Sequence, residues 1–186
     1  MLAKINWFGL AGGVTTLVMI AVSMVYPWWR LTIGDNLFTA NASPVNTNFG
    51  ALGTTFAIPF ICALNVVSLL SLVASSVAML IYSVLPRKSY SKQLLSFGYK
   101  KPLYIVLFFV IGLVVTMLIC QTVVNLSIPL MGSTTSTLAI PFVSGVTIMV
   151  LLSAGFQWSF WVAVVGAGLC IAARLYHKKV APMPKV

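Results

Sequence analysis

The stretch Pro86–Pro102, PRKSYSKQLLSFGYKKP, holds five of the eleven Lys and Arg residues and lies between two long apolar runs. It divides the 186 residues into two similar halves. Short segments rich in Lys and Arg stay on the cytoplasmic side of a membrane. The side on which this stretch lies therefore sets the side of every other loop.

The composition is that of a membrane protein. The chain is 60% hydrophobic and only 6% charged, whereas soluble domains contain roughly 25% charged residues. Its apolar runs are long enough to cross a hydrocarbon core of ~30 Å, which takes ~20 residues as a helix. These features exclude a water-soluble fold and predict a multi-pass protein of the cell membrane.

The basic residues follow the positive-inside rule. Net charge is +10, and Asp35 is the single acid. Only Arg30 falls outside the two termini and the central stretch, so both termini are predicted to be cytoplasmic. The lipid bilayer, with its anionic head groups, is then the expected partner of the charge, and no nucleic acid is required. The ten remaining basic residues are Lys4, Arg87, Lys88, Lys92, Lys100, Lys101, Arg174, Lys178, Lys179 and Lys185.

The hydropathy pattern predicts an all-α membrane protein, a bundle of four transmembrane helices with a small extracytoplasmic loop region that contains β-structure. The chain is then one integral membrane domain, residues 1–186. Its spans are expected at about 5–26, 58–85, 103–128 and 152–176, its outer loops at 27–57 and 129–151, and its cytoplasmic loop at 86–102. The cytoplasmic loop suits either an amphipathic helix on the inner leaflet or a plain loop.

The outer loops carry strand signals. Turn residues Gly34–Asp35–Asn36 predict a hairpin over Trp29–Ala40. The phrase FAIPF at Phe56–Phe60 recurs as LAIPF at Leu138–Phe142, so both loops are expected to pair in one small sheet. Leu138–Leu152 is open to three interpretations: strand, re-entrant segment, or the start of a long fourth helix. A fifth crossing there is excluded, because it would place the Lys-rich tail outside.

Small and polar residues within the spans mark helix contacts. The expected packing positions, in pairs four residues apart that let helix backbones approach closely, are Gly9 and Gly13, Ser71 and Ser75, and Gly168 and Ala172. Asn65, Gln121 and Asn125 form a candidate polar cluster inside the membrane, and interhelical hydrogen bonds explain it more simply than a transport path does. Asn41 lies in an N-x-S sequon and is the candidate glycosylation site.

No catalytic, cofactor or metal site is expected. Cys62, Cys120 and Cys170 all lie in apolar runs without C-x-x-C spacing, and His177 has no second ligand nearby in the sequence. A charged side chain deep in a span is the usual sign of chemistry within a membrane, and the spans contain none except Arg174 at the cytoplasmic end of the last one. The chain is therefore not expected to be an enzyme.

Four helices with a longer first outer loop that opens on Trp28 and Trp29 resemble the claudin-like architecture in outline. In that family the first loop combines a Trp motif with two cysteines, and this loop has no cysteine, so no family is assigned.

The leading hypothesis is a non-catalytic subunit that packs against and stabilises a larger membrane complex, for example a respiratory one, or a homo-oligomer. The alternatives are a small channel or carrier, and a surface adhesion or envelope protein that acts through its outer loops.

Overall fold

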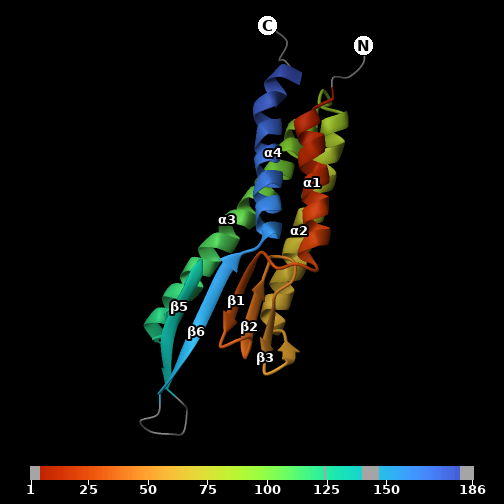
Figure 1. Ribbon diagram of the computed structural model, residues 1–186. Coiled ribbons are helices and arrows are strands. Elements are labelled where there is room, and N and C mark those ends of the chain that lie inside the picture. The colour runs from red at the N-terminus through yellow and green to blue at the C-terminus, as the bar shows by residue number, and fades with distance from the viewer. Residues whose placement is uncertain (1–4, 124, 140–146, 181–186) are drawn as a thin grey trace.

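The computed structural model describes residues 5–123, 125–139 and 147–180. Four helices pack side by side, and a sheet lies at one end of them (Figure 1). The helices are α1 (Trp7–Ser23), α2 (Pro59–Val84), α3 (Ser91–Val123) and α4 (Trp158–Val180). The strands are β1 (Trp29–Ile33), β2 (Phe38–Ala42), β3 (Asn48–Ala51), β4 (Thr54–Phe56), β5 (Gly132–Ala139) and β6 (Thr147–Phe156).

The sheet corrects the predicted fold class. All six strands form one antiparallel sheet in the order β4-β3-β2-β1-β6-β5, so the all-α assignment was wrong. The hairpin of β1 and β2 is confirmed, with positive φ angles at Gly34, Asp35 and Asn36 in its turn. The pairing of β1 with β6, which sets Trp29 opposite Phe156, joins the two outer loops. Such a long-range pairing leaves no local pattern in the sequence, and this is why the extent of the sheet was underestimated.

The sheet has one apolar and one polar face. Alternate residues of a strand point to opposite faces. Trp29 and Leu31 of β1 are buried in a cluster with Leu152 and Ala154 of β6, while Arg30 between them is exposed. Antiparallel sheets commonly cover one face and leave the other to water. The uncovered face is polar over β1 and β2, and on β6 it carries the exposed Met149 and Leu151.

The first residues of α3 and α4 differ from those that the sequence predicted. α3 starts at Ser91 and takes in most of the basic stretch, so this stretch is neither a separate surface helix nor a plain loop. Pro102 lies inside α3, where it removes the hydrogen bond to the Gly98 carbonyl, and it is fully buried. α4 starts at Trp158 rather than at residue 152. Leu152 belongs to β6 instead, because its backbone pairs with strands on both sides.

The segment Leu138–Leu152 is thus resolved in favour of strand at both ends. Ala139 ends β5, and Thr147 opens β6 opposite it. Residues 140–146, the middle of this segment, lie outside the described residues.

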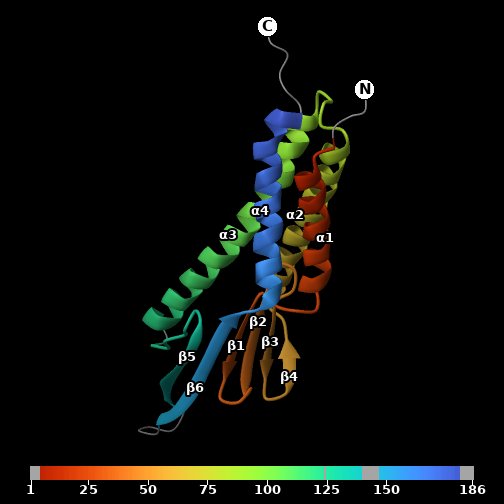
Figure 2. The same cartoon turned by 45° about the horizontal axis from the view of Figure 1, so that its top comes forward.

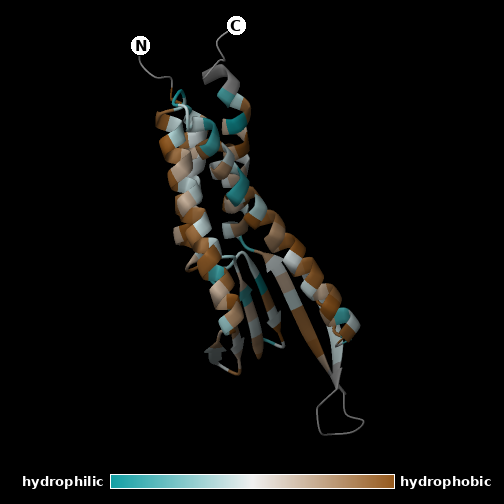
Figure 3. Ribbon diagram, turned by 180° about the vertical axis from the view of Figure 1, so that it is seen from behind, coloured by the Kyte–Doolittle hydropathy of each residue, from teal (hydrophilic) through white to brown (hydrophobic). Residues whose placement is uncertain are grey.

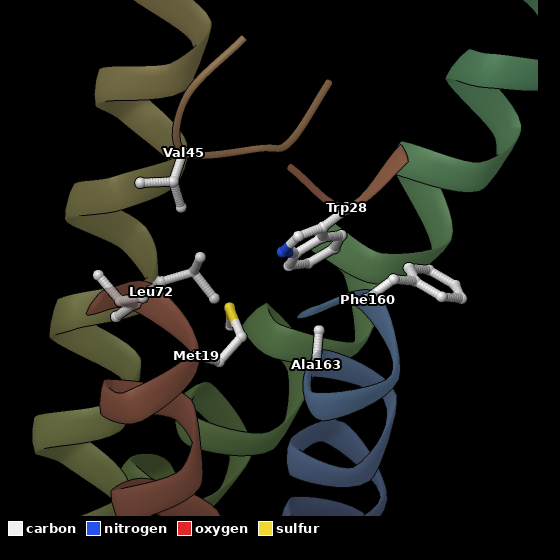
Figure 4. Close-up of a cluster of buried hydrophobic side chains, with 7 residues drawn as sticks. Met19, Trp28, Val45, Leu72, Phe160 and Ala163 are labelled. Atoms are coloured by element: carbon white, nitrogen blue, oxygen red, sulfur yellow. The ribbon is translucent and has the colours of Figure 1, made fainter. Parts of the chain in front are cut away.

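A buried cluster joins the helices to the sheet. It contains Trp28, with no exposed surface, packed among residues of α1, α2 and α4 (Figure 4). The Trp28 indole Nε1 donates a hydrogen bond of 2.6 Å to the Ser23 hydroxyl at the end of α1. We call this set the junction cluster; its buried members are Met19, Ile20, Trp28, Val45, Leu72, Phe160 and Ala163.

The helices support the predicted membrane location. By length and composition α2, α3 and residues Trp158–His177 of α4 can each cross a membrane, and α1 is a shorter apolar helix of 17 residues. The first described helix begins, and the last one ends, at the end opposite the sheet (Figure 1).

Candidate functional site

α2 and α3 run past the ends of α1 and α4. The Phe109 ring lies 5.1 Å from that of Trp28 and 6.4 Å from that of Phe160, which places it at the level of the junction cluster. From Phe109, α3 continues for 14 residues to Val123, or about 21 Å at 1.5 Å per residue. This part lies beside β5 and β6 (Figure 2).

α2 also extends past the ends of α1 and α4, near the other edge of the sheet. Leu72 belongs to the junction cluster, and the 13 residues from Pro59 to Ser71 precede it, which is about 20 Å of helix. We call residues 59–71 the outer segment of α2 and residues 110–123 the outer segment of α3. Both flank the apolar face of the sheet.

The outer segment of α3 is covered by the sheet along one narrow stripe only. Leu113 and Met117, one helical turn apart, pack on the apolar face of the sheet. In the most hydrophobic stretch of α3 no residue is buried by the rest of the described chain. The apolar surface therefore continues along the helix without cover (Figure 3). Exposed side chains of this segment include Ile111, Val114, Val115, Leu118, Ile119 and Val123.

A hollow of about 390 Å³ lies between α2 and α3, and the loop that joins β2 and β3 lines part of it. Its lining is mainly apolar and includes Leu64 and Phe108. Asn65 also lines it and is only 8% exposed, yet its carboxamide makes no hydrogen bond within the described ranges. No buried side-chain nitrogen or oxygen atom of the described residues lacks a hydrogen-bond partner, so the amide atoms of Asn65 reach the open surface of the hollow. Asn65 thus offers a donor and an acceptor to whatever enters the hollow.

The predicted polar cluster does not assemble around Asn65. Across the hollow from it lie Gly112 and Thr116 of α3. Gln121 comes nine residues after Gly112, about 13 Å further along the helix, and is exposed. Asn125 follows the end of α3 with φ of 53° and is also exposed. Gln121 and Asn125 therefore do not line the hollow that Asn65 lines.

The predicted small residues divide into internal contacts and open positions. A Cβ at Gly9 would meet the Ser83 hydroxyl, and one at Gly13 would lie 2.9 Å from Leu80, both on α2. The G-x-x-x-G of α1 thus serves a contact within the chain. Nothing lies within 4 Å of a Cβ built at Gly168.

The other three predicted packing residues lie on α2 and α4. Ser75 is buried, and its hydroxyl donates to the Leu72 carbonyl at 2.9 Å. Ser71 and Ala172 are half-buried. None of these positions requires a second chain for its burial.

Asn41, the candidate glycosylation site, lies on β2. Its Nδ2, the atom that would carry the sugar, donates a 3.0 Å hydrogen bond to Oδ1 of Asn48 on β3. The two asparagines face each other directly in the register of the strands. They occupy the polar face of the sheet, because they alternate with Ala40, which is buried in the apolar cluster.

At the end of the helices opposite the sheet, a polar network joins α1, α2 and α4. The Asn6 Oδ1 accepts from the Gly9 N–H and caps α1, while its Nδ2 donates to the Tyr82 hydroxyl at 2.8 Å and to the Ala173 carbonyl at 3.0 Å. The Tyr82 hydroxyl lies 2.9 Å from His177 Nδ1.

Sequence reasoning missed this network. An Asn just before an apolar run is a helix-cap signal, so the sequence could have identified Asn6 as the cap of the first helix. His177 was assigned to a tail, but α4 extends to Val180 and carries it to Tyr82. No group of three His, Cys, Asp or Glu residues that could hold a metal occurs in the described part of the chain. The chain matches no protein-family model and no curated protein sequence.

Proposed function

We propose that the chain is a non-catalytic integral membrane subunit whose outer segments of α2 and α3 pack against another membrane protein. The observation that carries this proposal is the apolar surface of the outer segment of α3, which the sheet covers along a single stripe.

The position of the membrane surface supports the proposal. Aromatic side chains concentrate where a helix leaves the hydrocarbon. The rings of Tyr26 and Trp158 lie 5.3 Å apart, tilted by 56°, beside the junction cluster, and Trp161 is 54% exposed one turn further along α4. Beyond this level lies a sheet with a polar, water-facing side. Apolar side chains of α3 at the level of the sheet then meet water unless a partner covers them, and exposed apolar patches of this size mark interaction sites.

The orientation follows from charge. The Lys-rich end, where the described chain begins and ends, is cytoplasmic and the sheet is outside, so that all four helices cross the bilayer. At 17 residues, α1 is about 25 Å long, and a small mismatch of this kind is absorbed at modest cost.

Reaction of a Lys88→Cys variant with an impermeant reagent added outside intact cells would contradict this orientation.

The partner is expected to present an apolar helix with at least one polar group. The hollow between α2 and α3 is mainly apolar, and the Asn65 amide is a polar group open to it. A helix with a Ser, Thr or Asn facing Asn65 would satisfy this amide, as polar side chains do between membrane helices. A second copy of the chain is a special case of the same proposal.

The test is extraction in a mild detergent followed by identification of the co-purified proteins. In a Val115→Trp and Leu118→Trp double variant we expect the recovered partner to fall about tenfold, since overpacking a close interface costs about 1–3 kcal/mol. Both side chains are exposed, Val115 at 47% and Leu118 at 55%, so Trp at these positions meets no neighbour within the chain and folding is expected to be preserved.

The matched control is Val18→Trp with Val165→Trp. These side chains are about as exposed, at 51% and 57%, but lie on the helices α1 and α4, where lipid is expected to cover them. Equal recovery of the partner from both double variants, or a wild-type chain that purifies alone and monodisperse, would refute the proposal.

A further inference from the structure

We propose that a basic hollow at the cytoplasmic end, between the first turns of α3 and the last turns of α4, binds a phosphate group. The hollow has a volume of about 340 Å³, within the range of ~300–1,000 Å³ that small-molecule sites occupy. Three of its seven lining residues are basic, Lys92, Lys100 and Arg174, and His177 adds an imidazole that can donate a hydrogen bond.

The helices place these groups on facing surfaces. Lys92, Ser96 and Lys100 follow one another at intervals of four residues, which puts them on one face of α3. Arg174 and His177 are three residues apart on one face of α4. All five line the same hollow, so side chains separated by about 80 residues in the sequence converge on one point.

Two of the groups are held in place by the fold. The Arg174 guanidinium carbon lies 4.5 Å from the centre of the Tyr99 ring, a cation–π arrangement that fixes the plane of the guanidinium. His177 is bound through Nδ1 to the Tyr82 hydroxyl, which leaves Nε2 for a ligand. Such positions are set before a ligand arrives, and preorganisation of this kind improves affinity.

No acidic side chain lies near the hollow to balance its charge. The single acid of the sequence, Asp35, lies in the turn between β1 and β2 at the opposite end of the molecule. Lys92 also stands in the first turn of α3, where the helix dipole disfavours a cation. Packing alone gives no reason to gather these charges, and a bound anion relieves their repulsion.

Phosphate is the anion that this arrangement suits. The planar fork of an Arg binds two phosphate oxygens at once, and Lys supplies a point charge. The Ser96 hydroxyl in the hollow adds a neutral donor. The phosphate can come from an anionic phospholipid of the inner leaflet or from a soluble phosphomonoester, and the same residues would contact either.

The experiment uses the purified full chain in detergent and measures bound lipid by native mass spectrometry. Phosphatidylglycerol is the probe and phosphatidylcholine is the neutral comparison. Arg174→Gln and Lys100→Gln are each expected to weaken phosphatidylglycerol binding about tenfold, because each removes a charge-assisted hydrogen bond. Arg87→Gln and Lys88→Gln remove the same charge at the same end outside the hollow, and they should leave binding unchanged.

Competition separates the two sources of phosphate. If soluble glycerol phosphate leaves the bound phosphatidylglycerol in place, the site is for lipid; if it displaces the lipid, the site takes free phosphomonoesters. Arg174 also packs on Tyr99, so Lys100→Gln, which leaves this contact intact, guards against loss through misfolding. Equal weakening by the hollow and the control variants, or weakening by neither, overturns the proposal.

Discussion

Replacing Trp28 by Ala is expected to lower the free energy of unfolding by about 3–5 kcal/mol, the range for truncating a buried aromatic residue. Trp28 has no exposed surface and its ring contacts Phe109 and Phe160 at 5.1 and 6.0 Å. The change also leaves the Ser23 hydroxyl without its indole partner. Because Trp28 connects the sheet to the helices, its loss should separate the two parts, and thermal unfolding in detergent measures the effect.

The matched control for this change is Trp7→Ala. Trp7 is 67% exposed at the opposite end of α1, so its removal should leave the melting temperature of the protein in detergent nearly unchanged. An equal loss of stability in both variants would show that the junction cluster does not connect sheet and helices as described.

Replacing Gly12 by Val should cost up to about 3 kcal/mol, the upper end for overpacking. A Cβ at Gly12 would lie 2.8 Å from Cys170 Sγ and 3.0 Å from the backbone nitrogen of Cys170. The sulfur can turn away, but the backbone of α4 cannot move without disturbing the contact along its length. The expected result is a lower melting temperature and a wider spacing of α1 and α4.

Gly168→Val provides the comparison, because Gly168 lies on α4 with open space around it. The two substitutions share the same chemistry and differ only in what the new side chain meets. A melting temperature that falls as far for Gly168→Val as for Gly12→Val would mean that helix propensity, rather than the α1–α4 contact, controls stability here.

The sequence was sufficient to find the helices and to predict that the two outer loops pair in one sheet, but not the extent of that sheet. Hydropathy marked four apolar regions, and the turn residues around Asp35 marked the first hairpin. Neither signal reports that Trp29 pairs with Phe156, because this pairing depends on the closed fold. Apolar residues such as Leu152 look the same to a hydropathy scan whether they face lipid or the inside of a sheet, and for this reason the fourth helix was started six residues too early.

The candidate site was predictable in part. Asn65 was singled out as a polar residue in an apolar run, and the structure places it in a hollow. Gln121 and Asn125 were selected by the same rule, but they lie past the point where α3 faces α2. The uncovered surface around Leu118 had no sequence signal, because an apolar helix reads alike whether lipid, a sheet or another protein covers it.

Native cysteines offer the most direct measurement of what covers the outer segments. Cys62 is exposed in the outer segment of α2, Cys120 is half-buried in that of α3, and Cys170 is buried within the helices. In intact membranes, with the partner in place, we expect Cys62 and Cys120 to resist a membrane-impermeant maleimide. After the partner has been removed in a harsher detergent and the chain has been reconstituted alone in nanodiscs, both should react, while Cys170 stays unreactive. Protection of Cys62 and Cys120 in those nanodiscs would contradict the proposal, because lipid alone would then cover both segments.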